Sequence, residues 1–319
     1  MSIREYRKRL VELESKLAEV KGEWERTQTI EKTVGAGQLV GSMRSIFSRQ
    51  SKIFKDPGWL QPSAEPPDGT PVARERLLRY LASVLSEVFR SRSCRNIFIF
   101  GEPGTGKTLC VRYALDQVKS YAAEMRLDLG VVYVNAGRTR SPYYTMLKIV
   151  RALGVDVPDV GWQFSRLKQA FEKIVTVKPV IIAVDEMEAL IFKQREPLIY
   201  YLNRQPNTTL ILISNKFSDV SALPPRAKST LQPMVAKFNP YTPEEAEEIL
   251  AERVEKAFQP GTVSTKILKK VAEAASKAGD IRVGFSILLT AGYLAERDGR
   301  GKIKLEDLET AAKAAEIIL

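Results

Sequence analysis

The clearest indication of the fold of this 319-residue chain is residues 101–108, which read Gly101-Glu102-Pro103-Gly104-Thr105-Gly106-Lys107-Thr108. It follows an apolar run, 96–100, and opens an amphipathic stretch, 107–118. A strand, a glycine-rich turn with Gly-Lys-Thr and a helix, in that order, are typical of a phosphate-binding loop. Backbone N–H groups of 104–108 and the positive end of the helix would hold a β-phosphate. The alternative is a glycine-rich turn with an incidental lysine.

Two side chains of this loop are expected to act on the bound nucleotide. Lys107 would reach the β- and γ-phosphates, and the Thr108 hydroxyl would hold Mg²⁺. The predicted ligand is ATP or ADP with Mg²⁺, bound by Gly101, Gly104, Thr105, Gly106, Lys107 and Thr108.

A buried strand that ends in two carboxylates predicts the second part of the site. The run 180–184 reads Val-Ile-Ile-Ala-Val and is followed by Asp185 and Glu186. Ligands of open α/β sheets bind outside the carboxyl ends of the strands. Asp185 would hold the metal with its water shell, and Glu186 would polarise the attacking water. The pair favours hydrolysis over binding alone; the alternative is a helix N-cap with an acidic first turn.

Three more polar residues would complete the site. Asn215 follows the apolar run 209–213 and would orient water if its strand neighbours the one ending at Asp185; otherwise it is a turn residue. Arg226 precedes the last predicted strand and would serve as an arginine finger on a neighbouring subunit's nucleotide. Arg282 lies in the first turn of a helix, where a cation opposes the dipole, so a phosphate contact would explain its place. A solvated surface role is the alternative for each arginine.

Strand and helix alternate from residue 73 to residue 240. Amphipathic stretches separate most of the apolar runs, which is typical of a doubly wound parallel sheet covered on both faces. The predicted strands are Ile97–Phe100, Val131–Val134, Val180–Val184, Thr209–Ile213 and Met234–Phe238.

Residues 241–319 are predicted to be entirely helical. Thr242 and Glu245 form a capping box with Pro243 at the first helical position, which opens a helix that runs to about residue 258. A small all-helical domain therefore follows the α/β domain. Further helices are expected from about Ser264, Asp280 and Leu305.

The first 72 residues differ from the rest. Apolar residues spaced alternately by three and four predict a heptad helix over 1–30, either in a coiled coil or lying on its own domain. Residues 31–72 are rich in glycine and proline and predict an extended connector. Phe54, Trp59 and Leu60 indicate that this connector lies on a surface. The heptad stripe is Ile3, Tyr6, Leu10, Leu13, Leu17, Val20 and Trp24.

Composition limits the chemistry. Without histidine, the chain has no Ser-His-Asp or Cys-His triad and no HExxH metal site. The chain has two cysteines, too few for a disulfide framework, which favours a protein of the reducing cytosol. The formal charge of +11 favours an acidic partner such as nucleic acid, with a solvated basic surface as the alternative. Apolar runs of about five residues are too short for a membrane span.

Six stretches carry a specific resemblance. In chain order they are GEPGTGKT, VIIAVDE, LISNKFSD, LPPRAKSTL, KFNPYTPEEAEEIL and AGDIRVGFSILLTAG. Together they resemble the archaeal and eukaryotic origin-recognition and replication-initiator family of AAA+ ATPases, from about residue 51 to the C-terminus. The resemblance implies an AAA+ α/β domain with a helical lid, and slow ATP hydrolysis.

The resemblance also implies roles for individual residues. Residues 104–108 correspond to the Walker A motif, and Asp185–Glu186 correspond to the Walker B motif. Asn215 corresponds to sensor 1. The arginine finger and sensor 2 of the family correspond to Arg226 and Arg282.

Two further correspondences concern DNA and the nucleotide entrance. Residues 154–168 match an insertion through which the family touches DNA. Arg74 matches an arginine near the nucleotide entrance, although Ala73 stands where a histidine is usual. The DNA candidates are Trp162, Arg166 and Lys168.

The sequence also departs from the family pattern. Members usually continue into a winged-helix domain that grips DNA, whereas this chain stops at Leu319, so a short natural protein and a truncated one are both open. The heptad helix is not usual and would supply self-association or a partner contact. Glu188 stands where an aspartate is common, and Lys228 where a second arginine is common.

The expected function is an ATP-dependent switch that binds double-stranded DNA in replication initiation. ATP would close the lid through Arg282, and a replicative helicase is the expected protein partner, in a cytoplasmic, nucleoid-associated setting. The alternative is a recruitment ATPase of the transposition-regulator or helicase-loader type, which acts mainly through a protein partner or nonspecific DNA. A nucleotide-free scaffold built on the heptad helix is disfavoured by the intact nucleotide motifs.

Overall fold

The computed structural model describes residues 51–314 apart from 68, 92, 94, 159, 160 and 192–197. The heptad helix predicted over 1–30 and the first part of the connector lie outside the described residues. Within the described part of the chain, no helix is both long and apolar enough to cross a membrane.

A five-stranded parallel sheet forms the centre of the α/β domain. Its strand order is β2-β3-β4-β1-β5, so the strand that leads into the glycine-rich loop lies inside the sheet. Strands β3 and β4 are hydrogen-bonded neighbours, with Val184 opposite Leu212. All five predicted strands are confirmed. Their bounds are β1 (Ile97–Gly101), β2 (Gly130–Asn135), β3 (Val180–Asp185), β4 (Thr208–Ser214) and β5 (Met234–Phe238).

The two faces of the sheet belong to two different cores. On β3, Ile182 and Val184 pack into a core with helices α7 (Pro142–Ala152), α8 (Phe164–Val177), α10 (Leu198–Asn203) and α12 (Pro225–Leu231). Ile181 and Ala183 pack on the other face with α3 (Glu75–Leu85) and α5 (Lys107–Glu124). Burial on both faces is why β3 is apolar from Val180 to Val184, up to the carboxylate that ends it.

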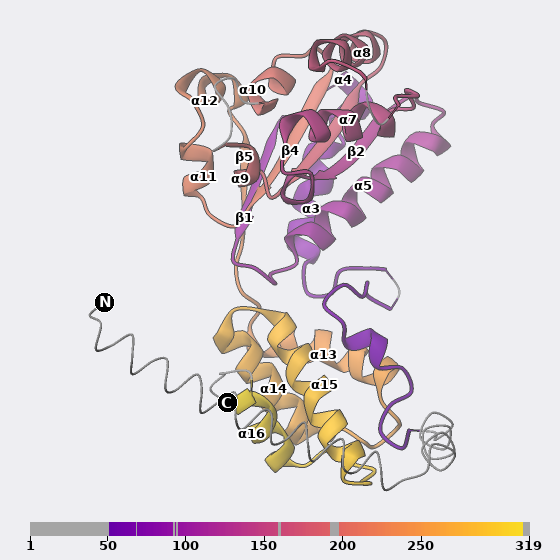
Figure 1. Ribbon diagram of the computed structural model, residues 1–319, viewed down its shortest axis with the longest axis vertical. Helices are drawn as coiled ribbons and strands as arrows, with labels where there is room; N and C mark the ends of the chain where they lie inside the picture. The colour runs from indigo at the N-terminus through magenta and orange to yellow at the C-terminus, as the bar shows by residue number, and fades with distance from the viewer. Residues whose placement is uncertain are drawn as a thin grey trace, which may run out of the picture. The chain divides into compact units, whose positions relative to one another are not determined.

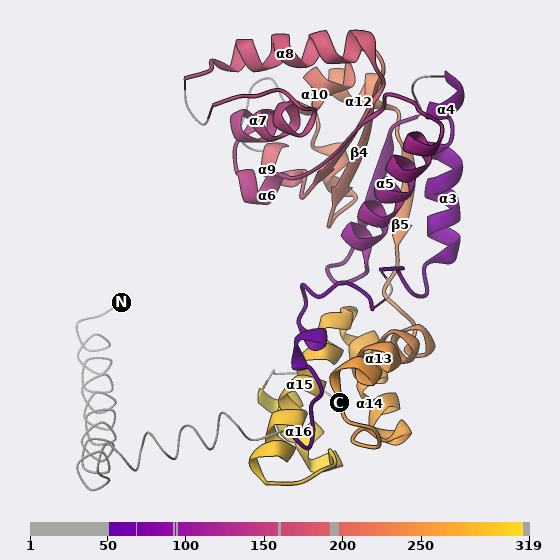
Figure 2. The same ribbon diagram turned by 90° about the vertical axis from the view of Figure 1, so that its right-hand side faces the viewer.

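Helices therefore cover both faces of this sheet, and Figure 2 shows α3 and α5 on one face and α6 and α7 on the other. Helix α5 extends six residues beyond its predicted end at residue 118, because the apolar spacing of its buried side continues to Ala122. The α/β helices are α3 (Glu75–Leu85), α4 (Val88–Ser91), α5 (Lys107–Glu124), α6 (Ala136–Thr139), α7 (Pro142–Ala152), α8 (Phe164–Val177), α9 (Glu188–Ile191), α10 (Leu198–Asn203), α11 (Ser218–Ser221) and α12 (Pro225–Leu231).

Over the described residues 241–314, four helices build the C-terminal helical domain (Figure 1). The capping box of α13 is confirmed: the Thr242 hydroxyl accepts from the Glu245 N–H, and the Glu245 carboxylate accepts from the Thr242 N–H. The predicted starts near Ser264 and Asp280 are confirmed as well, because both residues are N-caps. The helices are α13 (Pro243–Ala257), α14 (Thr265–Ala278), α15 (Ile281–Arg297) and α16 (Leu305–Ala314).

Residues 52–67, here called the strap, precede the α/β domain in sequence but pack on the helical domain. Phe54 is buried in the core of the helical domain and stacks on Phe258, with ring centroids 5.0 Å apart. A Cβ at Gly292 would overlap the Phe54 ring, so the glycine makes room for it. Figure 1 shows the strap in indigo beside α13 and α15. The prediction that the connector lies on a surface is confirmed, and that surface belongs to the helical domain.

A buried arginine fastens the strap to α13. The Arg253 side chain is 5% exposed and donates to the carbonyl oxygens of Trp59, Ala64 and Glu65. A short 3-10 helix, η1 (Pro57–Leu60), corrects the expectation of a fully extended connector. It forms because the Asp56 carboxylate accepts from the Gly58 N–H and proline tolerates the first helical turn.

Replacing Phe54 with leucine is expected to lower the free energy of unfolding by about 1–2 kcal/mol. The variant loses the aromatic stacking on Phe258 and fills its space less well. Urea unfolding followed by far-UV circular dichroism measures the change. Met125→Leu is the control, because Met125 is 55% exposed and its replacement should shift the free energy of unfolding by less than about 0.5 kcal/mol. An equal effect of the two changes would show that the Phe54 ring adds no more stability than an exposed side chain.

Candidate nucleotide site

The glycine-rich loop connects β1 to α5, and residues of the helical domain pack closely against it. Gly104 and Gly106 have φ angles of +71° and +84°, a region that favours glycine. A Cβ at Gly104 would overlap the Asp280 carboxylate, and one at Gly106 would overlap the Tyr241 hydroxyl. Both positions therefore require glycine for conformation and for space.

Lys107 begins α5 and turns its ammonium group back into the loop. Its Nζ donates to the carbonyl oxygens of Gly101 and Glu102 at 2.6 and 2.8 Å, and to Asn215 Oδ1 at 3.2 Å. The residue is 7% exposed, and burial lowers its pKa while nearby Asp185 opposes that shift. A buried ammonium group among neutral acceptors is ready to exchange them for anionic phosphate oxygens, which bind it more strongly.

Asp185 meets two hydroxyl groups at the carboxyl end of β3. Thr108 Oγ1 donates to Asp185 Oδ2 at 2.7 Å, and the Tyr133 hydroxyl donates to the same oxygen at 2.6 Å. Burial first, and then the bond to Asp185, raise the pKa of Tyr133. Carboxylate and hydroxyl oxygens are ligands that suit Mg²⁺, which keeps several waters and takes one or two carboxylates from the protein. The donor set fits the expected metal.

Glu186 is turned toward the end of β2. Asn135 Nδ2 donates to Glu186 Oε1 at 3.0 Å, and the backbone of Glu186 has a φ of +52°. A non-glycine residue in that region carries backbone strain, which the surrounding contacts must offset. The amide therefore holds the carboxylate that was predicted to polarise water.

Asn215 lies beside this group because β4 neighbours β3. Its Oδ1 accepts from Lys107, and its Nδ2 donates to Glu188 Oε1 at 3.2 Å. Burial raises the pKa of the Glu188 carboxyl. The strand adjacency on which the role of Asn215 depended is therefore present, and its amide oxygen faces the lysine.

The helical domain places Asp280 against the loop, and Arg282 is bound to Asp280. The Arg282 guanidinium binds the Asp280 carboxylate, with Nε 2.9 Å from Oδ1, which raises the pKa of the arginine. Burial alone would raise the pKa of Asp280, but the bonds from Arg282 outweigh it and the pKa is lowered. Asp280 also packs on Gly104. The pair neutralises the cation that would otherwise oppose the dipole of α15.

The other two arginines occupy different surroundings. Arg226 is exposed in the first turn of α12, which leaves its charge available to a neighbouring subunit. Arg74 is 6% exposed and donates to a backbone carbonyl group of the loop and to one of residues 239–242, which connect β5 to α13 and are here called the linker. It lies against the loop from within the protein.

The segment predicted to touch DNA carries cations over aromatic rings. The Arg166 guanidinium lies 4.1 Å from the centre of the Trp162 ring, and Arg166 is exposed. Lys168 is half-buried, with its Nζ 4.4 Å from the centre of the Tyr201 ring. Arg166 is therefore the more available of the two cations to an external phosphate.

Two residues of the site were missed at the level of sequence. Tyr133 and Asn135 lie on β2, and the strand register places Asn135 opposite Asp185. A polar residue after an apolar run was the available signal, but the sequence does not tell which strand neighbours β3.

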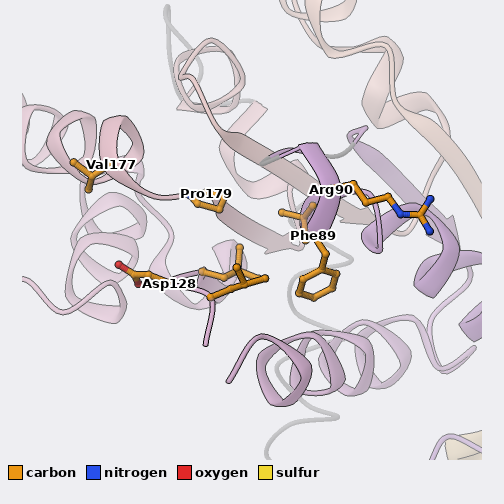
Figure 3. Close-up of a pocket in the computed structure, with 8 residues that line it drawn as sticks. Phe89, Arg90, Asp128, Val177 and Pro179 are labelled. Atoms are coloured by element: carbon orange, nitrogen blue, oxygen red, sulfur yellow. The ribbon is translucent and has the colours of Figure 1, made fainter. Parts of the chain in front are cut away.

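A small hollow of about 250 Å³ lies at the opposite edge of the sheet. Figure 3 shows Phe89, Arg90, Asp128, Val177 and Pro179 around it. It is lined by residues just before the starts of β2 and β3, whereas Asp185 and Asn215 follow the ends of their strands. Its volume is also smaller than the range of about 300–1,000 Å³ that is usual for ligand pockets. The hollow is thus separate from the nucleotide site.

Two domain families match the chain. The Cdc6 AAA+ ATPase-type lid domain matches residues 247–313, and the AAA domain matches residues 90–216. The first covers most of the helical domain. The second covers β1 to β4 with the glycine-rich loop and both carboxylates.

Curated relatives match across both domains. An ORC1-type DNA replication protein 1 of Sulfurisphaera tokodaii is 32% identical over 283 residues, which are 86% of this chain and 70% of the relative. An ORC1-type DNA replication protein of Pyrococcus furiosus is 31% identical over 268 residues, which are 80% of this chain and 63% of the relative. The chain thus spans about two thirds of the length of these relatives.

Solved structures agree in fold. The Aeropyrum pernix ORC1 protein, in complex with DNA, has a TM-score of 0.72 and 31% identity over 84% of this chain and 71% of that one. The Aeropyrum pernix ORC2 protein, in ADPNP and ADP complexes, has a TM-score of 0.71 at 20% identity, which supports the fold alone. With an AAA+ sheet, a Cdc6-type lid and 32% identity across both, the chain belongs to the family of ORC1-type DNA replication proteins.

Proposed function

We propose that the chain is an ATP-driven switch that grips double-stranded DNA during replication initiation. One observation carries the proposal: five polar groups from the start of α5 and from the ends of β3 and β4 lie at the same edge of the sheet. They are the Lys107 ammonium, the Thr108 hydroxyl, the carboxylates of Asp185 and Glu186, and the Asn215 amide. Membership of the ORC1-type family supports the same conclusion.

Nucleotide binding would start with an exchange of partners at Lys107. Its ammonium group leaves the loop carbonyls of Gly101 and Glu102 for phosphate oxygens. Thr108 and Asp185 would hold Mg²⁺, which supplies charge neutralisation at the phosphates when bound. Gly101, Gly104, Thr105 and Gly106 contribute the backbone of the cradle.

Hydrolysis requires a base, and Glu186 is the candidate. In the present arrangement Asn135 donates to Glu186 Oε1 and holds the carboxylate toward the end of β2, so we expect that the side chain must reorient before it polarises water at the nucleotide. This requirement supports slow turnover, which suits a switch better than a motor. Asn215 would orient the same water through its amide oxygen.

The helical domain would respond through Arg282. Its guanidinium is bound to Asp280, and the Asp280 carboxylate already lies against Gly104 of the loop. A phosphate that takes Arg282 from Asp280 would draw α15 toward the nucleotide. Arg226 would act on the nucleotide of a neighbouring subunit, and a replicative helicase is the proposed protein partner of the ATP state, in a cytoplasmic, nucleoid-associated setting.

Double-stranded DNA would be held chiefly through its phosphates, with Arg166, Trp162 and Lys168 in the contact. Fluorescence anisotropy of a labelled random-sequence duplex tests this with ATP, with ADP and without nucleotide. We expect tighter binding with ATP. With about five phosphate contacts, log affinity should fall against log salt with a slope of roughly −4.5. A flat salt response, or equal binding in all three states, would contradict the proposal.

Arg166→Ala is expected to weaken duplex binding several-fold and to reduce the steepness of the salt dependence by about 0.9, the loss of one phosphate contact. The exposed side chain stacks on Trp162 and is not needed for the core. Lys119→Ala, which removes an exposed cation of α5, is the matched control and should leave the slope unchanged. Equal slopes for the two variants would remove Arg166 from the interface.

A further inference from the structure

Arg74 binds the glycine-rich loop from the side that faces the protein interior. It is the N-cap residue of α3 and is 6% exposed. Its Nε and Nη2 lie 3.3 and 3.2 Å from the carbonyl oxygen of Thr105, and Nη2 also donates to the Asn239 carbonyl at 2.9 Å. Its Nη1 lies 3.5 Å from the Glu245 carboxylate, in the capping box of α13. One guanidinium therefore joins the loop, the linker and the helical domain.

Aromatic packing fixes the plane of this guanidinium. Its central carbon lies 3.6 Å from the centre of the Tyr241 ring and 5.9 Å from that of Phe238. The Tyr241 hydroxyl in turn occupies the space that a Cβ at Gly106 would need. A planar fork stacked on a ring presents its N–H groups in fixed directions, which a lysine ammonium group does not do.

The bond to Thr105 has a consequence for the next amide. A trans peptide unit is planar, with its carbonyl oxygen and the following N–H on opposite sides. Arg74 holds the Thr105 carbonyl oxygen toward the protein interior. The Gly106 N–H of the same peptide unit therefore points in the opposite direction, away from the interior. That amide is one of those that a phosphate-binding loop uses to hold a β-phosphate.

We propose that Arg74 is a positioning residue of the nucleotide site: by holding the Thr105 carbonyl it aims the Gly106 N–H at the phosphate without touching the nucleotide. This inference rests on the proposed nucleotide site. It gives Arg74 a different role from a contact at the nucleotide entrance, because the fork is buried and bonded to backbone. It also explains why an arginine, and not a smaller N-cap residue, begins α3.

Arg74→Met tests the role by ADP affinity, measured by the fluorescence of a labelled ADP. We expect the affinity to fall about tenfold. Arg253→Met is the matched control, because Arg253 is equally buried, donates to three backbone carbonyl groups and stacks on Phe285 at 5.3 Å, but fastens the strap instead of the loop. Its ADP affinity should stay within twofold of the unchanged chain. Both variants are compared at a temperature at which circular dichroism shows them folded.

The Gly106 amide provides a readout that general destabilisation would not move. In the unchanged chain and in Arg253→Met, ADP should shift the Gly106 ¹H–¹⁵N resonance downfield, and in Arg74→Met this shift should be largely lost. Arg74→Lys keeps charge and length, so it covers the case in which the methionine variant does not fold, and it should also bind ADP more weakly. A full Gly106 shift and ADP affinity within twofold in the Arg74 variants would overturn the proposal. Failure of the unchanged chain to bind ADP would instead overturn the nucleotide site itself.

Discussion

Replacing Lys107 with alanine is expected to weaken ATP and ADP binding by about 30-fold to several thousandfold. The side chain is the buried cation of the glycine-rich loop, and its removal leaves the phosphate charge without its ammonium partner. Truncating one member of a buried hydrogen-bonded charge pair costs about 2–5 kcal/mol, which corresponds to a factor of about 30 to several thousand in affinity. Titration of labelled ADP, followed by fluorescence, measures the change.

Lys119→Ala is the control for this experiment. Lys119 lies on the same helix, α5, but its side chain is 52% exposed and pairs with Asp116. It should bind ADP as the unchanged chain does. Nucleotide affinity in Lys107→Ala within threefold of this control would refute the assignment of the loop as the phosphate site.

Replacing Glu186 with glutamine is expected to leave ATP binding nearly intact and to reduce kcat by about 10²–10⁴-fold. Glutamine keeps the size of the side chain and an oxygen that accepts from Asn135, so the local structure is preserved. It cannot take a proton from water, and general-base catalysis contributes about that factor. Phosphate release under saturating ATP, together with a separate titration of ATP affinity, distinguishes the two effects.

Glu124→Gln is the matched control, because Glu124 is exposed at the end of α5. It should leave both turnover and ATP affinity unchanged. Turnover in Glu186→Gln equal to that of Glu124→Gln would remove Glu186 from the role of base. A joint loss of binding and turnover would indicate that Glu186 supports the loop rather than the reaction.

The strands and the helical domain could be predicted because their signals are local. An unbroken apolar run such as 180–184 has one stable place, inside a sheet covered on both faces. The capping box at Thr242 and the N-caps at Ser264 and Asp280 form hydrogen bonds between residues at most three positions apart. Both partners of each bond can therefore be recognised in a short stretch of sequence.

Much of the site could not be predicted because its contacts join distant positions. Tyr133 reaches Asp185 across neighbouring strands, and Arg74 reaches the linker 165 residues later. Nothing local marks such pairs. The extent of α5 was underestimated for a related reason: in its last turns Ala122 is buried and Tyr121 contacts the distant Phe89 ring. The roles of the site residues stay predictions until the variants above are measured.

The contacts of the strap also imply an order in which the two domains fold during synthesis. Lys55 and its partner Glu255 are 200 residues apart in the chain, and the whole α/β domain lies between them. At about 5–20 residues per second, a ribosome needs roughly 10–40 s to make that interval. The α/β domain can therefore fold while Ile53 and Phe54 are still exposed, because the helices that cover them have not yet left the ribosome. The helical domain closes last, so premature termination within it would leave a folded sheet with an unpaired apolar strap.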